Sequence, residues 1–325
     1  MTHYLKRQFL LLQAIRDFFN RQGFFDVLTP PLVENPGMEP HIHPFLVTSA
    51  YSQQKSMAYL HTSPEFHMKE LLSYGFEKIF TLSYCFRDEP HSRLHRPQFI
   101  MLEWYRLNSH YSAIEKDVVA LIQFCAEELQ KREIPILKEM KNFQPHIMTI
   151  HDCFEKFVGL DLSTVKSAEE FKEWIIDHRP HVPMPKEMLS WDDYFFLLFL
   201  NEIEPQLKSI PCCILKEYPA SMAALSTLKK DQPEVCERFE IYINGVEIAN
   251  CYNELTQLAP QKKRFHEQAL LKEKIYHYKL PEPSQFYQTM QRGFPASAGI
   301  ALGVERLLMA LIGESNVFWP TLEEN

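Results

Sequence analysis

The chain has 325 residues, a length that suits one large domain or two ordinary ones. Hydrophobic residues make up 46% and charged residues 23%, which supplies material for a buried core and argues against a disordered chain. The formal net charge of −8 argues against a protein that depends on a basic nucleic-acid-binding face, and a basic protein partner is at least as compatible with it as tRNA.

The seven cysteines are scattered and include no C-x-x-C pair, which gives little support to a zinc site. An odd, scattered set is typical of reduced thiols in a cytoplasmic protein. No run approaches the ~20 apolar residues of a membrane-spanning helix, and no signal peptide is expected.

The first half of the chain predicts helices and strands in alternation. Apolar spacing indicates a helix over residues 3–21, with Gly23 as its stop. A short strand follows at 24–28 and ends at Pro30, and residues 63–73 read as a helix with Ser63 as a candidate cap. Strands are expected at 80–89 and 99–106, joined by a polar loop.

The second half adds a long amphipathic helix at 111–132 and further helices over 166–208. Residues 238–252 predict a hairpin whose two-residue turn is Asn244-Gly245. A Gly-rich strand then leads into a helix at 304–311. These elements predict an α+β domain built around an antiparallel sheet.

Polar side chains gather on one face of the first strand pair. Alternation places Arg87 and Glu89 on the face that carries Glu103 and Tyr105 in the returning strand, and it leaves Phe80 on the other, apolar face. A solvated sheet face would explain the pattern. A ligand floor would explain it as well, with Arg87 gripping a carboxylate or phosphate and Phe99 stacking on a flat ring.

The hairpin places Glu240 and Glu247 on one face, roughly 7–8 Å apart between Cα atoms. Two carboxylates this close are costly unless a cation lies between them, and Mg²⁺ suits carboxylate oxygens. Two solvated glutamates on an edge hairpin remain the alternative. Simple alternation places Asn250 on the opposite face.

The C-terminal strand and helix carry Gly299, Gly303 and Arg306. A helix N-terminus beside an arginine can bind phosphate, although a tight packing turn with a surface arginine would look the same. The glycine clustering predicts close backbone approach or a sharp turn.

Taken together, these segments resemble the three motifs of class II aminoacyl-tRNA synthetases: residues 23–30, residues 86–99 and Gly303-Val304-Glu305-Arg306. Residues 62–65, 101–105 and 247–255 are similar to the lysyl branch. Within that branch, residues 63–69 and 101–106 are similar to the elongation factor P–(R)-β-lysine ligases. Gln98, Arg96 and Glu305 depart from the usual Glu, Asn and Asp, and the first two put the ATP contacts of the loop in doubt.

The resemblance implies roles for individual residues. It implies an ATP-facing set, with Mg²⁺ held by Glu240 and Glu247: Arg87, Asp88, Glu89, His95, Arg96, Phe99, Glu240, Glu247, Ile248, Gly303 and Arg306. Of these, Arg87, Glu240, Glu247 and Arg306 are the expected catalytic residues. The substrate pocket would comprise Ser63, Pro64, Glu65, Glu103, Tyr105, Asn250, Glu254 and Ala301, with Tyr105 and Glu254 clasping the side-chain ammonium. Ala301 stands where lysyl-tRNA synthetases carry Gly, and its methyl group could favour a β-amine over an α-amine.

The implied activity is adenylation of (R)-β-lysine or lysine by ATP, followed by transfer to a lysine of elongation factor P. A tRNA or metabolite acceptor, and an inactive regulatory paralogue, are the alternatives. The chain is expected to be one catalytic domain over 1–325 with a helical insertion at roughly 107–210, without an anticodon-binding domain. The resemblance also implies a homodimer and makes stable tRNA binding unexpected.

Overall fold

The computed structural model describes residues 2–51, 58–90, 92–314 and 317–318. The chain divides into two compact units, residues 1–141 with 251–325, and residues 142–250. Both units combine strands and helices, so the predicted α+β class is confirmed. The predicted helical insertion starts at about residue 107, whereas the helix that follows residue 107 belongs to the first unit.

The first unit is built on four paired strands in the order β1-β5-β6-β13. These are β1 (Phe25–Asp26), β5 (Lys78–Phe86), β6 (Gln98–Leu107) and β13 (Ser297–Gly303). β1 runs parallel to β5, and the other pairs are antiparallel. A small sheet has the order β2-β4-β3, from β2 (Leu32–Val33), β3 (Leu46–Val47) and β4 (Ala58–Leu60).

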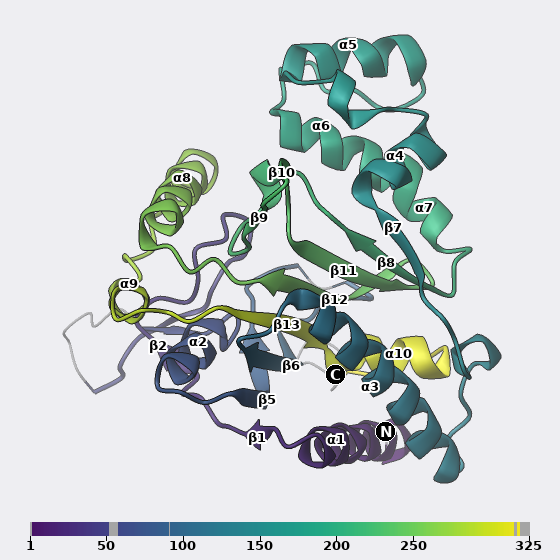
Figure 1. The fold of residues 1–325 in the computed structure, drawn as a ribbon, viewed down its shortest axis with the longest axis vertical. Helices are drawn as coiled ribbons and strands as arrows, with labels where there is room; N and C mark the ends of the chain where they lie inside the picture. The colour runs from purple at the N-terminus through teal and green to yellow at the C-terminus, as the bar shows by residue number, and fades with distance from the viewer. Residues whose placement is uncertain (1, 52–57, 91, 315–316, 319–325) are drawn as a thin grey trace. The chain divides into compact units, whose positions relative to one another are not determined.

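One face of this sheet is covered by α1 (Thr2–Arg21), which packs on α3 (Tyr111–Lys131) and α10 (Val304–Ile312) (Figure 1). The ring of Phe19 lies 4.7 Å from that of Phe80 and 5.2 Å from that of Trp104. Phe80 and Trp104 are direct partners in the β5–β6 ladder. This is the apolar face that strand alternation predicted, and it leaves the polar face for the site.

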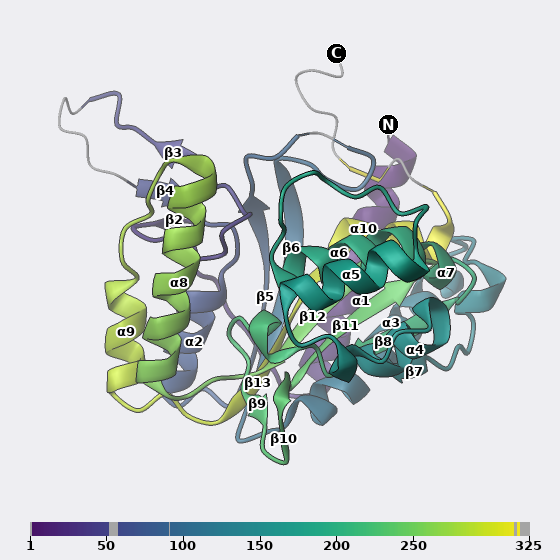
Figure 2. The same cartoon turned by 90° about the horizontal axis from the view of Figure 1, so that it is seen from above.

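Three further helices of the first unit pack side by side (Figure 2). α9 (Ser284–Gln291) contacts both α2 (Glu65–Ser73) and α8 (Leu258–Tyr276). The ring of Phe66 stacks on that of Phe286 at 4.4 Å. This contact ties α2, which bears predicted site residues, to α9.

The second unit contains β7 (His146–Thr149), β8 (Cys212–Lys216), β11 (Arg238–Ile243) and the start of β12 (Val246–Asn253), in the order β12-β11-β8-β7. Asn244 and Gly245 both have positive φ, at 49° and 76°, which confirms the predicted turn. A small hairpin comprises β9 (Leu228–Lys229) and β10 (Gln232–Cys236).

Helices of the second unit begin at capping boxes: α4 (Ile150–Val158) at Thr149, α5 (Ala168–His178) at Ser167 and α6 (Trp191–Leu198) at Ser190. A π-helical segment (Phe199–Ile203) leads to α7 (Glu204–Leu207). Short 3₁₀ turns lie at Lys138–Met140, Leu162–Thr164 and Ala220–Met222. α5, α6, the π-helical segment and α7 lie within the helices predicted over 166–208. α4 lies before that range and was not predicted as a separate helix.

Two other sequence predictions can be compared with the described residues. All seven cysteines are buried and free of disulfides, as predicted for reduced thiols. Within the described part of the chain, no helix is both long enough and apolar enough to cross a membrane.

Candidate active site

The polar face of the first unit's sheet is arranged in matched positions on β6 and β13. Tyr105 lies directly opposite Gly299, and Glu103 lies opposite Ala301. Partners in an antiparallel ladder share a face, so the small residues of β13 lie beside the large polar residues of β6. The predicted face is therefore present, and the Tyr105 ring packs over Gly299, where β13 carries no side chain.

Gly299 is the glycine that this arrangement requires. A Cβ atom there would lie 2.1 Å from the Tyr105 ring, closer than real Cβ atoms approach. At Gly303 the nearest contact of a Cβ atom would be 3.6 Å, to Arg306, which is ordinary packing. The close approach predicted for this cluster is confirmed at Gly299, whereas Gly303 has no such steric need.

Beyond β5 the chain leaves the ladder earlier than predicted. β5 ends at Phe86, so Arg87 and Glu89 lie in the loop and not on a strand face. The Arg87 N–H still donates to the Pro97 carbonyl at 2.8 Å, but the Asp88 N–H turns to the carbonyl of His43 at 2.7 Å. Proline cannot donate a ladder hydrogen bond, which explains why pairing stops there.

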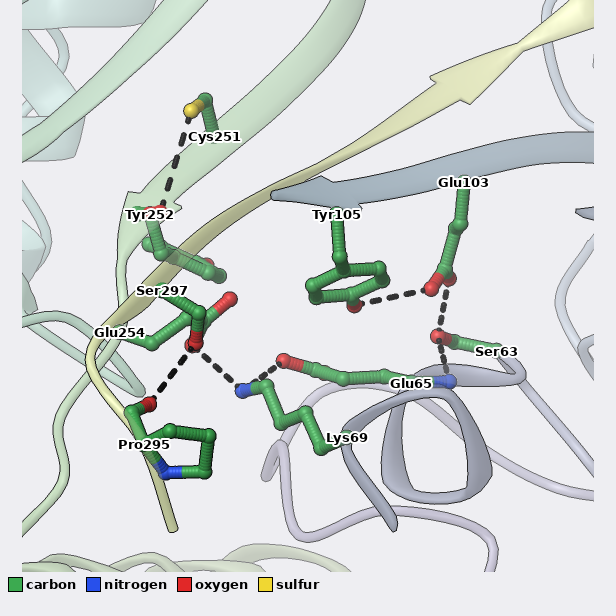
Figure 3. A network of polar contacts seen from close by, with 10 residues as sticks. All are labelled: Ser63, Glu65, Lys69, Glu103, Tyr105, Cys251, Tyr252, Glu254, Pro295 and Ser297. Atoms are coloured by element: carbon green, nitrogen blue, oxygen red, sulfur yellow. Dashed lines mark hydrogen bonds and ion pairs between the residues drawn. The ribbon is translucent and has the colours of Figure 1, made fainter. Parts of the chain in front are cut away.

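A chain of hydrogen bonds joins the start of α2 to the sheet (Figure 3). The Ser63 hydroxyl donates to Glu103 and accepts from the Glu65 N–H at 3.1 Å. Tyr105 donates to the other oxygen of Glu103 at 3.0 Å. Pro64, rather than Ser63, occupies the N-cap position of α2. Burial and the nearby charge of Glu65 raise the pKa of Glu103 to about 8.

A second polar chain contains a residue that sequence reasoning missed. Lys69 lies one helical turn beyond Glu65 and is fully buried. Its ammonium is 2.6 Å from a carboxylate oxygen of Glu65 and 2.6 Å from one of Glu254 (Figure 3). Burial raises the pKa of Glu254 to about 7, against the opposing effect of Lys69. The i, i+4 spacing was the available signal for Lys69, although such pairs usually lie on helix surfaces.

Arg87 and Phe99 contact each other. The Arg87 guanidinium lies 5.2 Å from the centre of the Phe99 ring. The Arg87 Nε is buried and has no hydrogen-bond partner among the described residues. A buried guanidinium N–H without an acceptor fits an anionic ligand group, which is what the sequence predicted for Arg87.

The loop before β6 approaches the start of α10. His95 lies 3.3 Å from Glu89 and 3.4 Å from an Arg306 nitrogen. The hydrogen bond from His95 lowers the pKa of Glu89. Arg96 donates to the Ser92 carbonyl at 2.7 Å, and its guanidinium lies 5.3 Å from the Phe318 ring. The loop residues predicted to face ATP thus lie around the N-terminus of α10.

Glu305, the departure from the usual Asp, has a structural position. Its carboxylate accepts from the Ile100 N–H at 3.0 Å and from Gln8 at 3.1 Å. Burial raises its pKa to about 7. The residue therefore joins α10, β6 and α1 and does not face the predicted pocket.

The predicted metal ligands belong to the second unit. Glu240 accepts hydrogen bonds from Tyr218 at 2.5 Å and Tyr242 at 2.6 Å, and from Arg238. The charge of Glu247 contributes to the raised pKa of both tyrosines, which places Glu247 near them. Ile248 is buried.

Asn250, which simple alternation places on the face opposite Glu247, contacts the Arg238 side chain. Arg238 donates from Nε to Asn250 at 3.0 Å and also contacts Glu240. A guanidinium carries five N–H donors on a long stem, so it can join side chains that alternation alone would separate. Arg238 was not predicted, although it shares a strand face with Glu240.

A cavity of about 180 Å³ adjoins Ser63 and Glu65 in the first unit. The residues that line it include Glu39, Glu70 and Glu282. Burial and the charge of Glu65 raise the pKa of Glu39. Space next to the start of α2 is thus lined by acidic side chains.

These residues suit the predicted ligands chemically. Arg87 and Arg306 are cations for a triphosphate, and the carboxylates and phenol around Lys69 are acceptors for ammonium groups. Glu240 is oriented by three donors, two on Oε2 and one on Oε1, so Oε1 keeps a lone pair that suits a ligand of Mg²⁺. Among the described residues, no group of three or more His, Cys, Asp or Glu side chains could hold a metal.

Comparison with known proteins gives a consistent result. Residues 1–319 match the family model of tRNA synthetases class II (D, K and N). An elongation factor P–(R)-beta-lysine ligase of Vibrio cholerae is 31% identical, covering 96% of this chain and 92% of the relative. Relatives of the same name from Haemophilus influenzae and Pseudoalteromonas translucida are 31% and 30% identical, covering 95% and 96% of this chain and 90% and 92% of the relatives. The chain belongs to the class II tRNA synthetase family, within the group of elongation factor P–(R)-beta-lysine ligases.

Proposed function

We propose that the protein is an ATP-dependent ligase that activates (R)-β-lysine, or lysine, as an aminoacyl-adenylate and transfers it to a lysine side chain of elongation factor P. The observation that carries this proposal is the acceptor set formed by the buried Glu103, Tyr105 and Glu254 with the half-buried Glu65. Buried carboxylates that outnumber their cations suit a ligand with two ammonium groups. The names of the relatives supply the acceptor protein.

The first step needs orientation and charge stabilisation. A carboxylate oxygen of the amino acid attacks the α-phosphorus of ATP, and pyrophosphate leaves. Arg87 would hold the carboxylate against the phosphate through its unpartnered Nε and stabilise the charge that develops there. Arg306 and His95 would bind phosphate oxygens at the start of α10.

In the second step, the acceptor lysine amine attacks the acyl carbon, AMP leaves, and the amine loses a proton. No enzyme nucleophile is required. We assign Glu240 and Glu247 to Mg²⁺, which when bound would neutralise triphosphate charge. Tyr218, Tyr242 and Arg238 would keep Glu240 in place.

The first test is ATP–pyrophosphate exchange with α-lysine, (R)-β-lysine and (S)-β-lysine. Exchange is expected with (R)-β-lysine, and loss of at least 100-fold is expected in Arg87→Ala, about what removal of a charge-stabilising donor costs. No exchange with any isomer would favour an inactive paralogue. Purified elongation factor P and tRNA(Lys) then serve as acceptors, and labelling of tRNA alone would overturn the proposal.

We also propose that the protein forms a homodimer through the segment after α1. Phe25 and Leu28 have 63% and 87% of their surface exposed. Apolar side chains exposed in this way suit a contact with a second copy. Light scattering should show a dimer that Leu28→Asp weakens, and a monomeric wild-type protein at micromolar concentration would contradict this.

A further inference from the structure

Lys69 occupies a position that the proposed chemistry does not explain by itself. The Lys69 side chain is 1% exposed, and its ammonium lies between the carboxylates of Glu65 and Glu254 (Figure 3). The Glu254 side chain is also 1% exposed. Phe286 of α9 covers it, with the ring centre 5.8 Å away. A buried cation thus stands among the acceptors proposed to bind a cationic substrate.

The surroundings of Lys69 are dominated by acidic groups. The titratable or charged groups linked electrostatically to this cluster are Glu39, Glu65, Arg87, Glu103, Tyr105, Cys251 and Glu254. Two ionised carboxylates near one another in a buried site are costly, and one of them takes up a proton unless a cation compensates. Lys69 is the cation in direct contact with both Glu65 and Glu254.

One of the two carboxylate oxygens of Glu254 is available to accept a hydrogen bond from a ligand. One oxygen, Oε2, faces Lys69 at 2.6 Å. The other, Oε1, is buried and has no hydrogen-bond donor among the described residues. An ionised carboxylate oxygen in this state is an acceptor prepared for an ammonium group.

We propose that Lys69 is a positioning residue for the amino-acid substrate: its ammonium holds the carboxylates of Glu65 and Glu254 in place, and so presents the free oxygen of Glu254 to a substrate ammonium. This role rests on the proposed function. Because Lys69 also lowers the pKa of Glu254, it implies that a proton on Glu254 competes with substrate less in the wild type than in a variant without this ammonium.

Replacing Lys69 by Met tests the role through the pH dependence of KM. Without the ammonium, the pKa of Glu254 rises further, because Lys69 lowers it in the wild type, and the substrate must displace a proton from Glu254 more often. The KM for (R)-β-lysine in pyrophosphate exchange should rise on the order of tenfold relative to wild type at pH 7. The ratio of variant to wild-type KM should then fall toward one by pH 9, because the proton is lost in solution. A simple packing defect would give a ratio that does not change with pH.

Three further variants control the experiment. Lys69→Gln keeps hydrogen-bond donors without charge and should behave like Lys69→Met, which covers the case in which the Met variant does not fold. Lys69→Arg restores a cation and should bring the KM ratio below about threefold at every pH. Lys229→Met removes a half-buried lysine of the second unit, whose ammonium lies 2.7 Å from Glu217, and it should give a ratio independent of pH.

The outcomes separate the two proposals. If wild type exchanges normally and both uncharged Lys69 variants show a pH-independent KM ratio, the positioning role is refuted and the proposed function stands. If folded wild-type protein shows no exchange with any lysine isomer, the proposed function is refuted, and the role of Lys69 with it.

Discussion

Gly299→Ala is the sharpest test of the pocket's construction. The new Cβ atom would lie 2.1, 2.2 and 2.9 Å from three carbons of the Tyr105 ring. To reach an ordinary contact near 3.5 Å, the ring must retreat by roughly 1.4 Å. Tyr105 is only 3% exposed, so its neighbours resist that movement, and its hydroxyl would leave Glu103. Overpacking and the lost hydrogen bond together predict a loss of about 2–4 kcal/mol.

Urea unfolding measures this loss, and Gly303→Ala provides a matched control on the same strand. At Gly303 the added methyl meets Arg306 at 3.6 Å and the backbone φ is −78°, so the stability change should stay within about 0.5 kcal/mol. Exchange with (R)-β-lysine should also weaken in Gly299→Ala because Tyr105 is displaced. If the two variants are equally stable, the steric account of Gly299 is wrong.

Three other predictions extend the test. Ala301→Gly removes a methyl opposite Glu103, and the ratio of kcat/KM for α-lysine to that for (R)-β-lysine should rise ~10-fold in pyrophosphate exchange; an unchanged ratio would remove Ala301 from the specificity argument. Because burial raises the pKa of Glu305 from 4.5 to about 7, its stabilising contribution is present below about pH 4.5 and is lost as the pH rises through 7. The free energy of unfolding of Glu305→Gln, relative to that of wild type, should therefore be higher at pH 8 than at pH 5 by on the order of 1–3 kcal/mol in urea unfolding. The opposite trend would contradict the buried carboxyl. Arg106→Lys breaks a two-bond contact with Asp117 and should cost about 1 kcal/mol, whereas Arg16→Lys in an exposed pair should cost almost nothing; equal costs would count against the argument.

Local patterns were enough to predict much of the first unit and a turn of the second. Strand alternation placed Glu103 and Tyr105 on one face and Phe80 on the other, and the ladder register agrees. The Asn244-Gly245 turn followed from its dipeptide, because few residues accept positive φ at both positions. These features depend on near neighbours in the chain.

The missed features depend on contacts between distant segments. Lys69 meets Glu254 across 185 positions of sequence, and no local pattern indicates that a Glu–Lys pair on a helix will be buried. After Pro97 ends the ladder, the Asp88 N–H pairs with the His43 carbonyl, a contact outside the predicted hairpin. The boundary at residue 142 likewise follows from tertiary packing, which composition does not reveal.

The double ion pair of Lys69 has a consequence for self-modification. A lysine amine is the group that the proposed reaction acylates, and it attacks only through an unprotonated lone pair. Although burial alone would lower the pKa of Lys69, the charges of Glu254 and Glu65 raise it above the usual lysine value. The enzyme's own amine is thereby kept inert beside a reactive acyl group, and peptide mapping after turnover should find Lys69 unmodified.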